Sequence, residues 1–168
     1  MKPAVFKGMV RETRLFRQVL LVLAAIAACL VGAQADELES FSVPLMQQSS
    51  GAFYIRGTLG ESVAADLLVD TGSSYVALSQ KTFDALQRSS AMTYVRSIKG
   101  ATANGRVVKA KVYEVSALAI GDECVLESVE AVVLPGADRD ILGLSALKRV
   151  EPFTFDLEPL ALRFEACR

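Results

Sequence analysis

The chain has 168 residues, of which 52% are hydrophobic and 22% charged, and it contains neither histidine nor tryptophan. The absence of histidine excludes His-dependent catalytic triads, His-based general acid–base catalysis and His-ligated metal sites. Residues 1–35 carry five of the 18 lysines and arginines but one of the 19 acidic residues, so residues 36–168 have 13 against 18 and a net charge of −5. A mildly acidic domain without a basic run is not expected to bind nucleic acid.

The first 35 residues contain the three parts of a secretory signal peptide. A basic stretch ends at Arg17, an uncharged apolar run covers residues 19–33, and Ala33-Gln34-Ala35 is a small–x–small cleavage site. The run Ile26-Ala27-Ala28-Cys29 also resembles a bacterial lipobox, which would leave Cys29 lipidated, and an uncleaved membrane anchor is a third interpretation. All three place the remaining domain outside the cytoplasm, in the periplasm or secreted, with membrane contact only through this segment.

Residues 36–168 are predicted to form one domain, because no repeat, linker or low-complexity tract interrupts them. Most of this part alternates polar and apolar residues with the period of two that is typical of β-strands. The predicted strands are residues 41–46, 53–59, 62–69, 75–78, 94–99, 107–115, 116–120, 124–126, 129–134, 153–156 and 161–164. A short helix is predicted over residues 82–88, with Ser79 as its N-cap. The pattern indicates a small all-β fold, a closed barrel with antiparallel strands throughout and one or two short helices.

Two cysteines, Cys124 and Cys167, remain once Cys29 is assigned to the N-terminal segment. An even pair in an oxidising compartment fits a disulfide, and two free thiols are the alternative. The sequence has no Cys-x-x-Cys motif, no Gly-rich phosphate loop and no cluster with metal-ligand spacing, so neither a cofactor nor a metal is expected.

One predicted strand, residues 62–69, runs directly into a turn that contains an ionisable residue. Leu68-Val69 precedes Asp70-Thr71-Gly72-Ser73, a turn rich in glycine and hydroxyl groups. Taken alone, Asp70 fits an Asx turn in which its carboxylate accepts nearby backbone N–H groups. A second apolar segment, Ile141-Leu142-Gly143, begins 71 residues downstream of Asp70, and Asn104-Gly105 between the two predicts a β-hairpin.

In this order, the two motifs resemble those of the pepsin-like and retropepsin-like aspartic peptidases. With its N-terminal segment, the chain is similar to the bacterial periplasmic branch of the retropepsin-like group. The resemblance implies a single-lobe acid-protease barrel in which Asp70 is the catalytic carboxylate. It also implies that Thr71 bonds to a partner loop, that Gly72 admits the substrate backbone, and that Ser73 supports Asp70 through its hydroxyl.

The resemblance assigns two further parts of the site. Ile141 and Leu142 would lie beside the catalytic loop, with Gly143 allowing close packing. The predicted hairpin matches the flap, and an exposed β-ribbon without a gating role is the alternative. The flap residues would be Ile98, Lys99, Gly100, Asn104 and Gly105. Viral members carry an acidic residue and an arginine where this chain has Ser74 and Leu144, so the details of their dimer and substrate contacts do not transfer.

Peptide hydrolysis by this route needs two carboxylates that share one proton around a water molecule. The chain has a single Asp-Thr-Gly, so the second Asp70 must come from a second molecule. The resemblance therefore implies a homodimer whose two-fold axis passes through the site, acting as an endopeptidase on a peptide or protein substrate.

Two other functions fit the same features. One is a non-catalytic dimeric module that binds peptides without cutting them, and the other is an envelope lipoprotein whose β-domain is only a scaffold. An intact Asp-Thr-Gly favours the peptidase, since a pure binder has no use for a costly buried carboxylate pair. The remaining acidic residues that stand out are expected to be structural, with Asp138 and Asp140 in a loop and Glu127 and Glu130 on a solvated edge. Asp66, on a predicted strand, is likewise expected to be structural.

Overall fold

In the computed structural model, the described residues are 40–101, 105–133 and 136–168. The predicted N-terminal segment 1–35, with its cleavage site and Cys29, lies outside them. So does Asn104 of the predicted flap.

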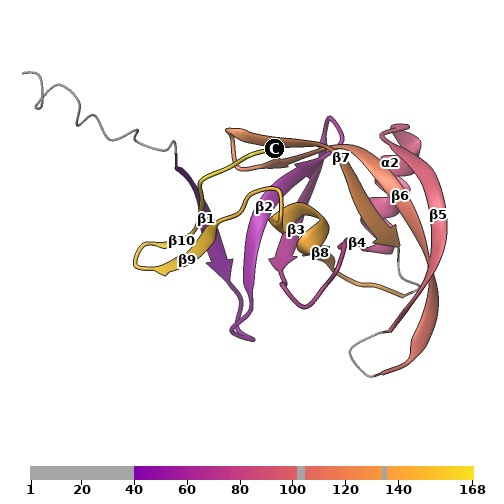
Figure 1. Cartoon of the computed structure of the whole chain (residues 1–168), viewed down its shortest axis with the longest axis horizontal. Helices are drawn as coiled ribbons and strands as arrows, with labels where there is room; N and C mark the ends of the chain where they lie inside the picture. Colours follow the sequence, from indigo (N-terminus) through magenta and orange to yellow (C-terminus); the bar gives the residue numbers. More distant parts are fainter. Residues whose placement is uncertain (1–39, 102–104, 134–135) are drawn as a thin grey trace, which may run out of the picture. The chain divides into compact units, whose positions relative to one another are not determined.

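Ten strands of the described residues form one sheet that closes on itself. The strands are β1 (Phe41–Gln47), β2 (Phe53–Leu59), β3 (Val63–Val69), β4 (Val76–Leu78), β5 (Met92–Ala101), β6 (Val107–Ile120), β7 (Cys124–Val133), β8 (Asp140–Leu142), β9 (Phe153–Leu157) and β10 (Leu160–Phe164). Their order in the sheet is β5-β6-β7-β4-β8-β3-β2-β1-β10-β9, and β6 also pairs with β2. This additional pairing closes β2, β3, β8, β4, β7 and β6 into a barrel (Figure 1). The predicted all-β barrel is therefore confirmed.

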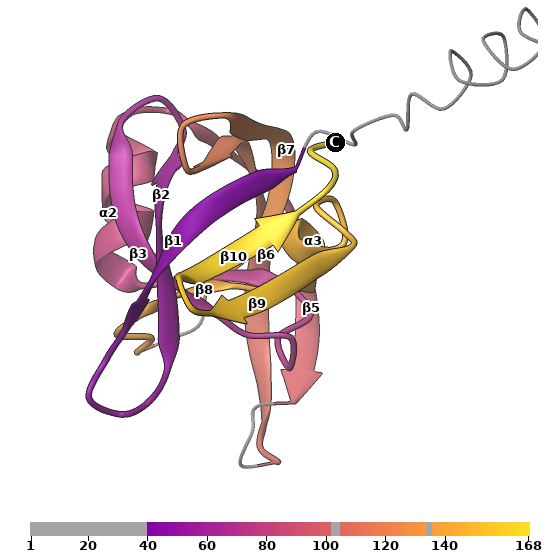
Figure 2. The same ribbon diagram turned by 90° about the vertical axis from the view of Figure 1, so that its left-hand side faces the viewer.

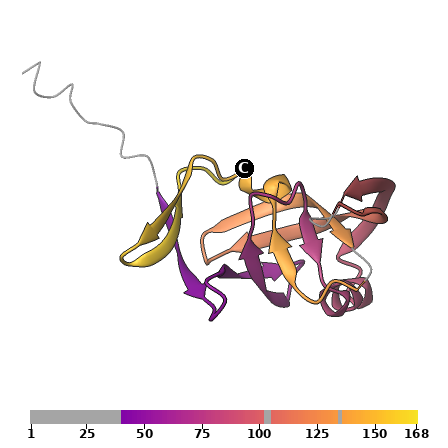
Figure 3. The same cartoon turned by 90° about the horizontal axis from the view of Figure 1, so that it is seen from below.

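Strand β1 connects the barrel to a terminal hairpin. Its first half pairs with β10 and its second half with β2, both antiparallel. Strands β9 and β10 form a hairpin of their own, and Figure 2 shows β1, β10 and β9 side by side. Seen from below in Figure 3, this yellow hairpin lies beside β1 and away from the helix that follows β4.

Two strand pairs run parallel, so the prediction of antiparallel pairing throughout was wrong. Strand β8 pairs in parallel with β3, and β4 pairs in parallel with β7. Strand β8 returns late in the chain and enters between β3 and β4, in the direction of β3. The alternation of polar and apolar residues reports which face a side chain takes but carries no information about strand direction.

Two predicted strand breaks are also absent. Residues 107–115 and 116–120 form the continuous strand β6, and residues 124–126 and 129–133 belong to β7. The successive pairs Val115–Val129 and Ala117–Glu127 pass over Ser116 and Ser128, and Ser128 has a φ of 51°. At this irregularity the alternation of buried and exposed side chains shifts by one residue on both strands. In the sequence, such a shift looks like the end of one strand and the start of another.

Buried side chains form a main core and a smaller second cluster. The main core fills the barrel, with fully buried residues such as Leu59, Leu67 and Leu142. The second cluster joins residues of β4, β6 and β7 and has three half-buried side chains packed against it. It consists of Ala77, Ala110, Val112 and Val132, with Tyr75, Ile98 and Ile141 packed against them. This cluster connects the β5–β6 hairpin to the segment that follows β3.

Helix α2 (Gln80–Arg88) is fixed to the barrel by a buried carboxylate. The Ser79 hydroxyl caps the helix by accepting from the Thr82 N–H, as predicted. Asp140, on β8 and only 8% exposed, accepts from the Ser79 N–H at 2.7 Å and from the Thr82 hydroxyl at 2.7 Å. Asp140 is thus a strand residue and not the predicted loop residue, and these hydrogen bonds offset the cost of its burial. Helix α3 (Leu144–Leu147) follows β8, and no helix of the described residues is long and apolar enough to cross a bilayer.

A disulfide joins Cys124, at the start of β7, to Cys167, after β10, with a Cα–Cα distance of 5.6 Å. The bridge closes a loop with a sequence separation of 43 residues. It ties the C-terminal segment to the barrel.

Replacing both Cys124 and Cys167 with alanine is expected to lower the free energy of unfolding by about 2–4 kcal/mol, because the unbridged unfolded chain gains loop entropy. Urea unfolding with and without reductant measures this. Reductant should lower the midpoint of the wild type and leave that of the double variant unchanged. Equal midpoints for the oxidised wild type and the variant would contradict the expectation.

Candidate active site

Asp70 follows the last residue of β3, at the point where the chain leaves the barrel. Its backbone N–H donates to the carbonyl of Leu142 on the neighbouring β8 at 3.1 Å. Its Oδ1 accepts from the N–H of Gly72 at 2.8 Å, so the carboxylate takes part in the Asx turn that the sequence allows. The half-buried Asp70 is therefore held both by its backbone and by one carboxylate oxygen.

Strand β8 passes between the two strands that the Asp70 segment connects. On one side, Leu68 pairs with Ile141 and Val69 with Leu142, and on the other side Ala77 of β4 pairs with Ile141. Leu142 points into the main core, whereas Ile141 packs against the second cluster. The two residues thus lie on a strand beside the Asp70 loop.

Gly143 brings the backbone after β8 into contact with the Asp70 loop. A Cβ atom at this position would lie 2.0 Å from the carbonyl oxygen of Tyr75 and 2.8 Å from that of Ser73. The next residue, Leu144, donates its N–H to the same Ser73 carbonyl at 2.8 Å. Any other residue at position 143 would collide with backbone atoms, so glycine is required here for close approach and not for an unusual φ.

The loop itself is shaped by serine hydroxyls. Ser73 donates its hydroxyl to the Tyr75 carbonyl at 2.7 Å, where a bond to the Asp70 carboxylate was expected, and its N–H donates to the Asp70 carbonyl at 3.3 Å. Ser145 of α3 accepts from the Val76 N–H and donates to the Glu130 carbonyl, both at 2.8 Å. Thr71 and Gly72 are exposed in the single chain. These bonds fix the loop on its barrel side and leave its tip at the surface.

The predicted flap residues Ile98, Lys99 and Gly100 lie on β5, opposite β6. Gly105 lies just before β6 with a φ of +78°, a conformation that favours glycine. Ile98 packs against the second cluster together with Tyr75 and Ile141. The hairpin therefore shares the second cluster with two residues that flank the Asp70 loop.

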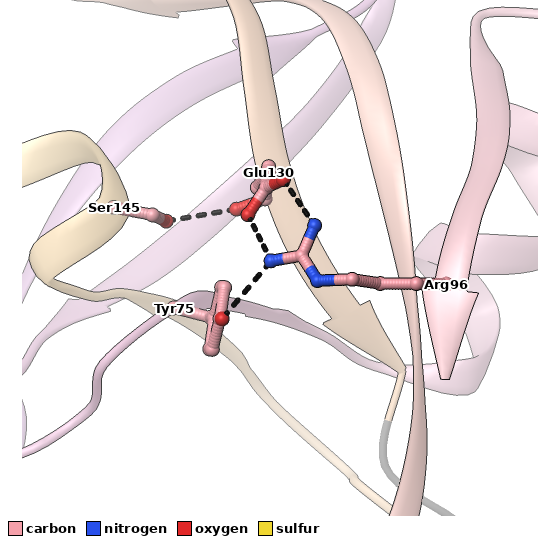
Figure 4. Close-up of polar contacts among 4 residues, drawn as sticks. All are labelled: Tyr75, Arg96, Glu130 and Ser145. Atoms are coloured by element: carbon pink, nitrogen blue, oxygen red, sulfur yellow. Dashed lines mark hydrogen bonds and ion pairs between the residues drawn. The ribbon is translucent and has the colours of Figure 1, made fainter. Parts of the chain in front are cut away.

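A polar cluster beside the loop was missed by the sequence analysis. Arg96 of β5 binds both carboxylate oxygens of Glu130, at 2.5 and 2.8 Å, and donates to the Tyr75 hydroxyl at 3.2 Å (Figure 4). Glu130 is thus an ion-pair partner and not part of the predicted solvated edge. The three residues are up to 55 positions apart in the sequence, and no local pattern connects them.

The contact between Arg96 and Glu130 shifts the pKa values of both side chains. The side-chain hydrogen bond from Arg96 holds the pKa of Glu130 below its ordinary value, and the bonds to Glu130 and Tyr75 raise the pKa of Arg96. A carboxylate with a lowered pKa stabilises the fold above its ordinary pKa, and this contribution is lost as the pH falls through the lowered value. The pair therefore remains charged in the neutral range.

The other acidic residues have structural contacts. Asp66 pairs with Arg56 across β2 and β3 at 2.8 Å, and Asp138 pairs with Arg139 at 3.1 Å, which lowers the pKa of Asp138.

Within the described part of the chain, no group of three or more Cys, Asp and Glu side chains is placed to hold a metal ion. A groove of about 730 Å³ lies between the β2–β3 hairpin, α2 and residues 137–140, and none of its lining residues belongs to the Asp70 loop or to β5.

Known proteins share this sequence pattern and this fold. A family model described as "gag-polyprotein putative aspartyl protease" matches residues 56–149, which include the Asp70 loop and Gly143. The chain belongs to this retropepsin-like aspartyl protease family. A solved structure, "a retropepsin-like aspartic protease from Rickettsia conorii", is 29% identical and superimposes with a TM-score of 0.56, over 76% of this chain and 94% of that one. No curated protein matches the sequence. In this family context, the Asp70 loop, together with the neighbouring strand β8, is the candidate active site.

Replacing Gly143 with alanine is expected to lower the free energy of unfolding by at least about 3 kcal/mol, because the new methyl group meets backbone and not a movable side chain. Urea unfolding followed by circular dichroism measures the change. Gly100→Ala is the matched control, since a Cβ there meets nothing within 4 Å. If the two variants proved equally stable, the close approach at Gly143 would not constrain the fold.

Proposed function

We propose that the protein is an aspartic endopeptidase that hydrolyses peptide bonds with a water molecule held between two Asp70 carboxylates, one from each subunit of a homodimer. The observation that carries this proposal is the single Asp70 loop, which follows β3 beside the parallel strand β8, in a chain of an aspartyl protease family. One chain supplies one such loop among its described residues, and the chemistry requires two.

The two carboxylates would divide the work of hydrolysis. In such a pair, the ionised carboxylate takes a proton from water while the protonated one polarises the substrate carbonyl. Two like charges a few ångströms apart do not both ionise readily, so the pair shares one proton and titrates as a unit. The Gly72 N–H orients one oxygen of Asp70, which keeps the carboxylate in a fixed direction before substrate arrives.

The exposed tip of the loop supports a dimer about this site. Thr71 and Gly72 are at the surface, and the groove of about 730 Å³ lies elsewhere. We assign Thr71 to a hydrogen bond with the partner's loop and Gly72 to close approach of the substrate backbone. The β5–β6 hairpin would act as the flap over a substrate bound in extended form, a mode in which backbone pairing supplies affinity.

We assign the domain to the periplasm or to secretion, with residues 1–35 as the signal peptide. The Cys124–Cys167 disulfide supports an oxidising compartment. Retention of the segment as an anchor, or lipidation at Cys29, would instead attach the domain to a membrane. Mass spectrometry of the mature N-terminus separates the three outcomes.

Replacing Asp70 with asparagine is expected to reduce cleavage of a peptide library, read by mass spectrometry between pH 4 and 7, by at least about a hundredfold. Asparagine keeps an oxygen for the Gly72 N–H, so the fold and the melting temperature should be retained. Asp66→Asn is the control, because Asp66 is an exposed aspartate on the same chain segment whose partner is Arg56. Cleavage by Asp70→Asn at the wild-type rate would refute the assignment of Asp70.

The two-chain site makes a further prediction. Adding excess Asp70→Asn chains to a fixed amount of wild type is expected to suppress cleavage, since mixed dimers hold one catalytic carboxylate. Excess Asp66→Asn chains should not suppress it. A folded, dimeric wild type that cuts no peptide would instead favour the non-catalytic peptide-binding module.

A further inference from the structure

Strand β5 contains one extra residue just before the predicted flap. Tyr94 pairs with Tyr113 of β6, and the next pair is Arg96 with Val112, so Val95 is passed over. In regular pairing Arg96 would lie on the same face as Tyr94. The bulge instead turns it to the face of the buried Val112, and re-aiming a side chain in this way is a known role of bulges near active sites.

The bulge lies where the sheet narrows from three strands to two. Strand β7 pairs with β6 from Lys111 onward, whereas residues 107–110 of β6 pair only with β5 among the described residues. We call residues 97–101 and 107–110 the flap ribbon. A two-stranded ribbon is marginally stable without further support. Its position over the rest of the molecule therefore depends on contacts at its base, where Arg96 lies.

The guanidinium of Arg96 joins the base of the flap ribbon to two other segments. It forms a two-pronged ion pair with Glu130 of β7, and the same nitrogen that binds Glu130 Oε2 also donates to the Tyr75 hydroxyl (Figure 4). Two-pronged pairs of this kind fix direction as well as distance. Arg96 and Glu130 are 41% and 35% exposed, so the pair lies at the surface of the molecule and not in its core.

Tyr75 in turn is fixed on its other side by the Asp70 loop. Its carbonyl accepts from the Ser73 hydroxyl and lies against Gly143. Its side chain packs on the second cluster, against which Ile98 of the flap ribbon also packs. A continuous set of contacts thus runs from Asp70 through Tyr75 to Arg96.

We propose that Arg96 is a positioning residue that sets the height of the flap ribbon above the Asp70 loop, and so controls the binding of the peptide more than the hydrolytic step. This inference rests on the proposed peptidase function. The direct hydrogen bonds of Asp70 are to Leu142, Gly72 and Ser73, so we expect its carboxylate to keep its place when Arg96 is changed.

The test compares Arg96→Met with Arg56→Met, using a peptide that the wild type cleaves. Arg56 is the matched control, because it forms an ion pair at 2.8 Å with Asp66 across another pair of strands. Arg96→Met is expected to raise KM about tenfold, equivalent to about 1.4 kcal/mol, and to change kcat by less than about threefold. Arg56→Met is expected to change neither constant. A fall in kcat at constant KM, or equal effects of the two variants, would overturn the proposal.

Conservative variants separate positioning from stability. Arg96→Lys keeps the charge opposite Glu130 but lacks the planar fork that reaches both Glu130 and Tyr75. We expect its melting temperature to be close to that of the wild type while KM remains raised. Tyr75→Phe should raise KM less than Arg96→Met, and the double variant should be no worse than Arg96→Met alone, because the two changes remove one shared contact. Full recovery of KM in Arg96→Lys, or additive effects in the double variant, would contradict the role of Tyr75.

Hydrogen exchange tests the inference without activity. Amides of the flap ribbon, residues 97–101 and 107–110, should exchange about tenfold faster in Arg96→Met than in Arg56→Met, because local opening becomes easier by about 1.4 kcal/mol. Equal exchange would overturn the positioning role. A wild type that cuts no peptide, together with faster exchange in Arg96→Met, would refute the peptidase function and retain Arg96 as the support of the ribbon.

Discussion

The structure depends on the passage of β8 between β3 and β4, with Gly143 in contact with the backbone of the Asp70 loop. Without a side chain at Gly143, the carbonyls of Ser73 and Tyr75 can approach the chain, and the Leu144 N–H satisfies the Ser73 carbonyl. The Leu142 carbonyl in turn accepts from Asp70. The position of the candidate catalytic carboxylate is therefore set by backbone atoms, which have few alternative conformations once the barrel has formed.

The two parts of the site are held by different kinds of contact. The Asp70 loop is held by backbone bonds and by two serine hydroxyls, and it borders the main core. The flap ribbon has two strands, contributes Ala110 and Ile98 to the second cluster and its border, and has Arg96 at its base. Tyr75 connects the two parts, because its carbonyl accepts from Ser73 in the loop, and its side chain packs on the second cluster and accepts from Arg96. In the proposed peptidase, the Asp70 loop would supply the reactive group and the flap ribbon would cover the substrate.

The sequence predicted most of the strands, the helix cap at Ser79 and the segments that meet at Asp70, because these features are local and depend on alternation, turn residues and capping chemistry. It did not predict the parallel pairing of β8, since alternation is the same for either direction. It also missed the contacts among Tyr75, Arg96 and Glu130. Arg96 reaches them only because Val95 is bulged, and nothing in the sequence around Val95 announces an extra residue. The Ser73 hydroxyl was expected to bind Asp70, but in the tight loop it donates to the carbonyl of Tyr75, two residues further along the chain.

Asp140 has a consequence for the alignment of β8 with its neighbours. This strand has only three residues, and so few backbone pairs leave its register weakly specified. Both ends of the strand hold residues that fit only one register. The buried carboxylate of Asp140 at the start is bound to Ser79 and Thr82, and Gly143 just after the end is in contact with backbone. A slip by one residue would bring Arg139 or Ile141 to the helix cap and a side chain against Tyr75. This three-residue strand is thus aligned by its ends, and the positions of α2 and of the Asp70 loop both depend on its register.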